Sequence, residues 1–292
     1  MTTTATELLL DDLTFAEGPR WHEGRLWFSD FFDHVVKTVD LAGNVESIVE
    51  VAGQPSGLGW LPDGRLLVVS MIDRRLMRLD PDGLVLHADL GHVAAFHCND
   101  MVVDAAGRAY VGNFGFDLDK AVAARPTPEE FAKLPTAVVA RVDPDGSVDV
   151  AADGFSFPNG TVITPDGRTM VVAETVGARL TAFDVDELGG LSNRRVWAAL
   201  PGTEPDGICL DADGHIWVAD PRGSQCALVA EGGTIIETIA TELPCYACML
   251  GGDDGRTLFL VTGRGTVRFA ATGERTGAIV TARVGTPRAG RP

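Results

Sequence analysis

The chain has 292 residues and a formal net charge of −17, from 41 acidic and 24 basic side chains. A surface of that sign repels phosphate groups, so we expect neither a nucleic acid nor an anionic membrane as a partner. No stretch reaches the roughly 20 apolar residues that span a bilayer, and Leu8–Leu10 is too short for a signal-peptide core, which predicts a cytoplasmic protein. The sequence leaves a monomer and a homodimer open.

A strand and six similar units follow in chain order. Residues 7–15 alternate weakly between apolar and polar side chains, as a strand does. Each unit then has a polar or small opening residue, a short apolar strand, a turn that ends in glycine, and a second apolar strand. The opening residues are Glu17, Ser56, Asn99, Asn159, Asp206 and Ala247. The turn glycines are Gly24, Gly64, Gly107, Gly167, Gly214 and Gly255, at intervals of 40, 43, 60, 47 and 41 residues.

This repeat predicts an all-β fold, a six-bladed β-propeller. Asp-Gly and related pairs supply the positive φ values that tight hairpin turns need. Stretches such as RLMRLD and RLTAFDVD lie between the hairpins and are typical of a third strand, followed by an outer fourth. Four strands in about 40 residues is the period of a propeller blade. We expect one domain over residues 1–292, in which the strand at 7–15 pairs with the last blade and closes the ring.

The longest interval contains an insertion at about residues 114–136. Within it, Thr127-Pro128-Glu129-Glu130 is typical of a helix start and predicts a short helix over 129–134. The second strand of a hairpin returns to the end where the first began, so the insertion should emerge on the face that carries the opening residues. We expect an apolar lid there, with a disordered loop at the rim as the alternative. The lid would use Phe114, Phe116 and Phe131.

Four of the six opening residues carry carboxylate or amide oxygens. The first strand of each blade lines the central channel, so these residues should form a ring on one face. Two carboxylates and two amides suit one divalent cation, Ca²⁺ foremost, with Mg²⁺, Mn²⁺ or Zn²⁺ also compatible. The alternative is a turn role, because Asn and Asp before Gly are ordinary turn residues. The predicted metal ligands are Glu17, Asn99, Asn159 and Asp206.

Four short motifs follow one another along the chain: Glu17-Gly-Pro-Arg-Trp, Asn99-Asp100, Pro158-Asn159-Gly160 and Pro205-Asp206-Gly207. Together they resemble the SMP-30/gluconolactonase/luciferin-regenerating family, and the resemblance covers about residues 17–262. The resemblance implies a six-bladed propeller in which Glu17, Asn159 and Asp206 bind the cation directly. It also implies that Asn99 is a ligand or lies beside the cation and touches the substrate, and that Asp206 is the general base.

The function that the resemblance implies is hydrolysis of a lactone or related cyclic ester. The cation would polarise the carbonyl group, and Asp206 would activate the attacking water. Two alternatives stay open: organophosphate hydrolysis on the same metal site, and a non-catalytic calcium-binding propeller with a regulatory role. Serine-hydrolase chemistry is disfavoured, because the chain has no G-x-S-x-G motif.

The residues around Asn99 depart from the family pattern. Sugar-lactone members often have Arg two residues before the matching Asn, whereas this chain has His97-Cys98-Asn99. A histidine donates fewer hydrogen bonds than an arginine, which favours a less polar lactone than a sugar-acid lactone. Hairpin geometry places the ends of the second strands on the same face. The predicted substrate contacts are His97, Asn99, Asn113, Phe114, Phe116 and Glu174.

The chain has five cysteines, an odd number that favours free thiols where no export signal is seen. Cys245 and Cys248 form a CxxC pair. A zinc or redox role for this pair is disfavoured, because the sequence offers neither a second CxxC nor a nearby histidine pair.

Overall fold

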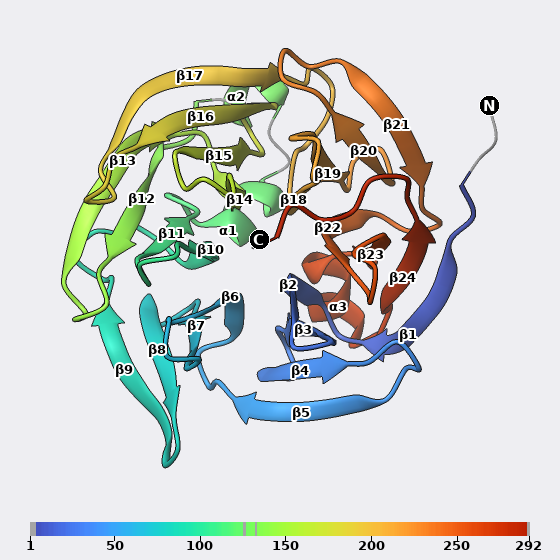
Figure 1. The fold of residues 1–292 in the computed structure, drawn as a ribbon, viewed down its shortest axis with the longest axis horizontal. Helices are drawn as coiled ribbons and strands as arrows, with labels where there is room; N and C mark the ends of the chain where they lie inside the picture. The colour runs from blue at the N-terminus through green and yellow to red at the C-terminus, as the bar shows by residue number, and fades with distance from the viewer. Residues whose placement is uncertain (1–3, 125–126, 132, 291–292) are drawn as a thin grey trace.

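The computed structural model of the protein describes residues 4–124, 127–131 and 133–290. Six four-stranded antiparallel sheets surround a central axis (Figure 1). Five sheets take their strands in chain order from the axis outwards, and the sixth combines strands from both ends of the chain. The predicted six-bladed β-propeller is confirmed.

The first three blades are continuous in the sequence. Blade 1 consists of β2 (Ala16–His22), β3 (Arg25–Asp30), β4 (Val35–Val39) and β5 (Val45–Glu50). Blade 2 consists of β6 (Pro55–Trp60), β7 (Leu66–Ser70), β8 (Arg75–Asp80) and β9 (Gly83–Asp89). Blade 3 consists of β10 (Cys98–Val103), β11 (Ala109–Asn113), β12 (Ala137–Val142) and β13 (Val148–Phe155).

The next two blades repeat this arrangement, and the last one closes the ring. Blade 4 consists of β14 (Pro158–Ile163), β15 (Thr169–Glu174), β16 (Arg179–Val185) and β17 (Leu191–Ala199). Blade 5 consists of β18 (Ile208–Leu210), β19 (Ile216–Asp220), β20 (Gln225–Val229) and β21 (Ile235–Ala240). Blade 6 consists of β22 (Cys245–Gly251), β23 (Thr257–Thr262), β24 (Gly277–Arg283) and β1 (Glu7–Leu13).

The N-terminal strand β1 is the outer strand of blade 6. It pairs antiparallel with β24, with Glu7 opposite Thr281 and Leu13 opposite Gly277. Figure 1 shows β1 beside β24 at the outer edge of this blade. The pairing joins the first and last blades through backbone hydrogen bonds, as the strand at 7–15 predicts.

The hairpin turns have the backbone conformation that the repeat predicts. The glycine that ends the first turn of each blade has a φ between 70° and 87° in all six blades. A side chain at such a φ costs free energy, so glycine is the residue that suits this position. The repeated glycine therefore fixes the spacing of the blades along the sequence.

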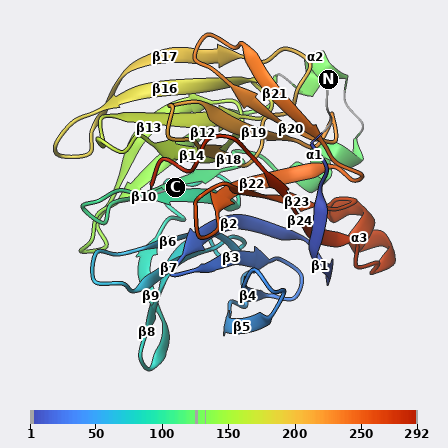
Figure 2. The same ribbon diagram turned by 45° about the vertical axis from the view of Figure 1, so that its right-hand side comes forward.

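Three helices lie on one side of the ring in the described residues: α1 (Leu118–Ala123), α2 (Pro128–Phe131) and α3 (Thr266–Thr272) (Figure 2). The predicted start of α2 is confirmed: the Thr127 amide donates to Glu130 Oε2 at 2.8 Å, and the Glu130 amide donates to Thr127 Oγ1 at 3.3 Å. The helix ends at Phe131, earlier than expected, and residue 132 lies outside the described residues. No helix in the described ranges is long and apolar enough to cross a membrane.

The core lies mainly between neighbouring blades. Trp21 of blade 1 stacks on Phe259 of blade 6, with 5.3 Å between the ring centroids. One buried cluster joins blades 1, 5 and 6, and it includes Trp217 and Cys248. All five cysteines are buried and free, as the odd count predicts. Packing of this kind holds the innermost strands in place around the axis.

Candidate active site

A cavity of about 630 Å³ lies where the innermost strands begin. The four predicted metal ligands all line this cavity, and each is only 5–8% exposed. Three of them belong to β2, β10 and β14, and the fourth lies two residues before β18. The structure therefore brings together four side chains that are up to 189 residues apart in the sequence. We call them the floor of the cavity: Glu17, Asn99, Asn159 and Asp206.

An irregularity in strand pairing lies beside the opening residue in five blades. The register between the first and second strands shifts between Glu17 and Arg20 in blade 1 and between Pro158 and Thr161 in blade 4. Blades 2, 3 and 6 have matching shifts. Such bulges change the direction of a side chain and are common beside active sites. They explain how the opening residues turn toward the cavity from the ends of regular strands.

The glycines that follow Ser56, Asn159 and Asp206 let the innermost strands of neighbouring blades pack closely. None of the three has a positive φ. A Cβ atom on Gly160 would lie 2.5 Å from the backbone nitrogen of Ile208, in the next blade. Glycine is therefore required because neighbouring innermost strands approach closely there. A turn role does not account for these glycines.

A chain of hydrogen bonds orients the two amides of the floor. The Thr175 hydroxyl donates to the Pro205 carbonyl at 2.8 Å, so it accepts from Asn159 Nδ2 at 3.1 Å. Asn159 Oδ1 in turn accepts from Asn99 Nδ2 at 3.1 Å. Ser56 Oγ donates to Asn99 Oδ1 at 3.3 Å, which gives the opening residue of blade 2 a supporting role. The amide oxygens are thus held in fixed directions before any ligand arrives.

The two carboxylates of the floor are buried and repel each other. Burial, followed by the charges of Asp206 and Asp100, raises the pKa of Glu17 well above its usual value. Burial and the charge of Asp100 likewise raise the pKa of Asp206. A bound cation would offset both the loss of hydration and the repulsion. The repulsion between these two buried carboxylates indicates that the floor suits a divalent cation.

Sequence reasoning missed two charged residues beside the floor, Arg20 and Asp100. Both are buried, and Arg20 donates to the carbonyl oxygens of Pro19 at 2.8 Å and Met101 at 2.6 Å. Its charge lowers the pKa of Asp100 and Glu17, against the larger effect of burial. With Asp206, the buried charged groups here are three carboxylates and one guanidinium, which leaves two negative charges when all are ionised. A divalent cation balances that charge, and carboxylate and amide oxygens are the donors that Ca²⁺ and Mg²⁺ prefer.

Above the floor, the cavity is lined mainly by apolar side chains. We call these side chains the wall. The insertion contributes Phe114, Leu118 and Phe131, so its first half and α2 both reach the cavity. The other apolar residues of the wall come from blades 1, 4, 5 and 6 and their connections: Phe15, Phe31, Phe157, Val176, Ala178, Pro221 and Tyr246.

Four of the predicted substrate contacts lie outside the described lining of the cavity. His97 is half-buried and stacks on Phe96, with 4.1 Å between ring centroids. Asn113 donates to the Val138 carbonyl at 2.9 Å and accepts from the Gly115 amide, so it orders the start of the insertion. Phe116 stands behind the wall, 6.0 Å from the rings of both Phe131 and Phe157. The fourth, Glu174, is also held away from the cavity.

Glu174 is fully buried and joins three parts of blade 4. It accepts from Arg179 Nε at 2.8 Å, from the Ser156 amide at 2.8 Å and from Arg194 at 3.3 Å. Burial raises its pKa, but the hydrogen bonds from Arg179, Ser156 and Thr181 outweigh burial and the net pKa is lowered. The side chain therefore supports the loop before Asn159 instead of facing a substrate.

We expect Glu174→Gln to lower the free energy of unfolding by about 2 kcal/mol, because it removes the charge of a fully buried side chain that accepts several hydrogen bonds, while its arginine partners stay partly exposed. The lowered pKa means that the carboxylate stabilises the fold fully above pH 4.5, and that this stabilisation is lost as the pH falls through the folded-state pKa. Urea denaturation of both proteins at neutral and acidic pH measures the difference. An equal loss at every pH would contradict this role.

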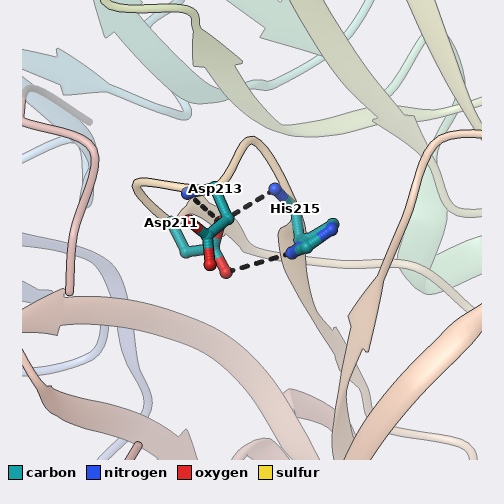
Figure 3. A group of neighbouring side chains, drawn as sticks. All are labelled: Asp211, Asp213 and His215. Carbon is teal, nitrogen blue, oxygen red and sulfur yellow. Dashed lines mark hydrogen bonds and ion pairs between the residues drawn. The ribbon is translucent and has the colours of Figure 1, made fainter. Parts of the chain in front are cut away.

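A second cluster of possible ligands lies in the turn between β18 and β19: Asp211, Asp213 and His215 (Figure 3). Asp206 lies two residues before β18 and Asp211 follows its last residue, so this turn is at the other end of the strand from the cavity. Asp211 Oδ1 accepts from the amides of Asp213 and His215, and Oδ2 lies 3.5 Å from His215 Nδ1. These contacts are those of a capped hairpin turn.

The comparisons with known proteins agree with the fold. Residues 15–264 match the model of the SMP-30/gluconolactonase/LRE-like region. Pentonolactonase XacC of Haloferax volcanii is 27% identical over 315 residues, which cover 99% of this chain and 97% of that protein. Regucalcin of Danio rerio is 30% identical over 171 residues, 56% of this chain and 53% of its own, so the chain spans about half the length of the regucalcin it matches.

A solved gluconolactonase of Xanthomonas campestris is 26% identical and superposes with a TM-score of 0.74, over 95% of this chain and 89% of that chain. The family model covers most of the sequence, from the start of blade 1 to the end of β23. The four motifs that carry the resemblance all lie within it. The chain belongs to the SMP-30/gluconolactonase/LRE-like family.

Proposed function

We propose that this protein is a divalent-metal-dependent hydrolase that opens a lactone or related cyclic ester. The observation that carries the proposal is the floor, where two buried carboxylates that repel each other stand beside two oriented amides. The relatives named as a pentonolactonase and a gluconolactonase support a lactonase. Glu17, Asn159 and Asp206 would hold the cation, with Asn99 as a further ligand or substrate contact.

The residues of the floor have separate roles in this proposal. When bound, the cation would polarise the lactone carbonyl and stabilise the oxyanion that develops. Asp206 accepts a proton from the attacking water, since it is the floor carboxylate that the family resemblance assigns as general base. Asn159 and Asn99 keep their oxygens in place through the hydrogen bonds to Thr175 and Ser56. The apolar wall excludes bulk water, which strengthens these electrostatic interactions.

Lactone opening releases a carboxylic acid, so a pH-stat assay over a panel of lactones tests the proposal. We expect hydrolysis of at least one lactone, loss of that activity with a chelator such as EDTA, and recovery on adding back Ca²⁺, Mg²⁺, Mn²⁺ or Zn²⁺. A phosphotriester in the same panel tests organophosphate hydrolysis. Cation binding with no ester opened would support the non-catalytic calcium-binding role, and activity that is insensitive to chelation would overturn metal dependence.

A further inference from the structure

We infer that the substrate is an uncharged lactone with a bulky apolar or aromatic substituent, and not a polyhydroxylated sugar lactone. This inference rests on the proposed lactonase function and names its substrate class. Three features of the cavity support it: the arrangement of the aromatic rings, the hydrogen bonds that nearby hydroxyl groups already donate, and the charge of the lining residues.

The aromatic rings form two groups that come from separated parts of the fold. One group joins blades 1 and 6, where Phe15 lies 5.3 Å from Phe31 and 4.8 Å from Tyr246 between ring centroids. The other lies at blades 3 and 4, where Phe114 packs edge-on against Phe157 at 4.9 Å. Because each ring packs against another, the apolar surfaces are fixed before a ligand binds. Such a site favours a rigid apolar group.

Two hydroxyl groups of the lining, those of Thr175 and Thr203, already donate hydrogen bonds within the protein. The Thr175 hydroxyl donates to the Pro205 carbonyl, and the Thr203 hydroxyl donates to the Leu200 carbonyl at 2.8 Å. A sugar lactone carries several hydroxyl groups, each of which loses its water on entering the cavity. Burying one hydroxyl without a partner weakens binding by roughly ten- to hundredfold. The phenylalanine and aliphatic side chains of the wall offer no such partner, so they disfavour a polyhydroxylated ring.

The charge of the lining excludes an anionic substrate. Among the described lining residues, Arg222 is the one with a basic side chain. It is paired with Glu204, with 3.4 Å between Nη1 and Oε1. The bound cation would be balanced by Glu17 and Asp206, so no positive charge is left for a carboxylate or phosphate on the substrate. An uncharged lactone needs no partner of opposite charge, so this lining can accept it.

Three δ-lactones of equal ring size test the inference: glucono-1,5-lactone, unsubstituted δ-valerolactone, and a phenyl-substituted δ-valerolactone. We expect kcat/KM for the phenyl compound to exceed that for gluconolactone by at least about 100-fold, from two or more unpaired hydroxyl groups. Equal or higher kcat/KM with gluconolactone would overturn the inference and leave the lactonase function intact. If no lactone is opened, the proposed function itself fails.

Binding supplies a readout that does not depend on turnover. Calorimetric titration of Asp206→Asn with the phenyl-substituted δ-lactam, which resists hydrolysis, should show binding at least about tenfold tighter than with the unsubstituted lactam. Equal affinity for the two lactams would overturn the inference. This measurement remains informative if the reaction turns out to differ from lactone opening.

A variant of the wall separates specificity from folding. Phe131 belongs to the insertion, outside the blades, so Phe131→Ala should leave the melting temperature nearly unchanged. We expect it to raise KM for the phenyl lactone by roughly tenfold while δ-valerolactone changes by less than about threefold. Phe32→Ala is the matched control, because Phe32 stacks on Phe269 at 4.5 Å and is outside the lining. A similar loss for both lactones in Phe131→Ala would contradict the apolar recognition.

Discussion

Replacing Asp206 with Asn is expected to lower kcat for lactone opening by about 10²–10⁴-fold, the usual contribution of a positioned general base. The change removes the group that accepts a proton and keeps the shape of the side chain. Asp206 is 8% exposed, and its backbone amide and carbonyl are both engaged in hydrogen bonds to neighbouring strands. The fold should therefore survive the substitution, as a circular dichroism spectrum and a melting curve would check.

The same variant should leave the metal-free fold at least as stable as the parent protein. Burial and the charge of Asp100 raise the pKa of Asp206, so its ionised form opposes folding at neutral pH. Asn removes that charge and relieves the repulsion. A loss of activity that came from unfolding would instead lower the melting temperature. The two measurements together distinguish a chemical role from a structural one.

Asp211→Asn is the matched control for Asp206→Asn. Asp211 is also a buried aspartate of blade 5, but it lies in the turn at the opposite end of β18 (Figure 3). Its Oδ1 accepts two backbone amides, which an asparagine can still accept. We expect this variant to keep kcat unchanged. Near parental turnover in Asp206→Asn, measured at saturating cation, would remove Asp206 from the mechanism.

The repeat was enough to predict the blades and the floor, because both follow from positions that recur. A glycine with positive φ ends each first turn, and four of the six residues that open the units line the same cavity. Gly57 and Gly160 recur for a reason that only the structure reveals, since their hydrogen atoms face the backbone of the next blade. A repeated position thus predicts location well even where its physical cause is misjudged.

Features that depend on contacts between distant residues could not be predicted in this way. The alternation of a regular strand placed His97 at the channel, but the register shift between Cys98 and Met101 breaks that alternation, and His97 stacks on Phe96. Helix α3 begins at Thr266, and its N-cap residue, Gly265, has no side chain that could cap it, so the sequence carries no side-chain start signal. Arg20 and Asp100 sit inside or beside recognised motifs, yet nothing local shows that they are buried together.

The second large effect concerns the cation itself, and Glu17→Gln is expected to weaken its binding. A cation at about 100 times its Kd should stabilise the parent protein by about 2.7 kcal/mol, a rise in melting temperature of roughly 4–5 °C. Without the Glu17 carboxylate, the floor loses one of its two anionic ligands, and most of this rise should disappear at the same cation concentration. Differential scanning calorimetry with EDTA and with added Ca²⁺ measures the rise directly.

Glu174→Gln is the control that separates ligand binding from general destabilisation. Glu17 and Glu174 are both buried glutamates, but only Glu17 faces the cavity. Glu174→Gln should lower the melting temperature by a similar amount with and without Ca²⁺, and so preserve the rise. Glu17→Gln should abolish the rise without lowering the metal-free melting temperature, because it relieves the repulsion with Asp206. The same change from Glu to Gln is thus expected to lower the metal-free melting temperature at position 174 and to lower the Ca²⁺-dependent rise at position 17.

An unchanged Ca²⁺ effect in Glu17→Gln would place the cation elsewhere. The turn of Asp211, Asp213 and His215 would then be the next candidate, and Asp211→Asn would test it. We expect the cation to bind at the floor and not at the turn, because only the floor has buried carboxylates that repel each other. Asp211 Oδ1 already has two amide donors, whereas Glu17 and Asp206 are buried with like charges close by. A cation binds most favourably where it relieves repulsion between carboxylates. The rise in melting temperature with Ca²⁺ should therefore depend on Glu17 and not on Asp211.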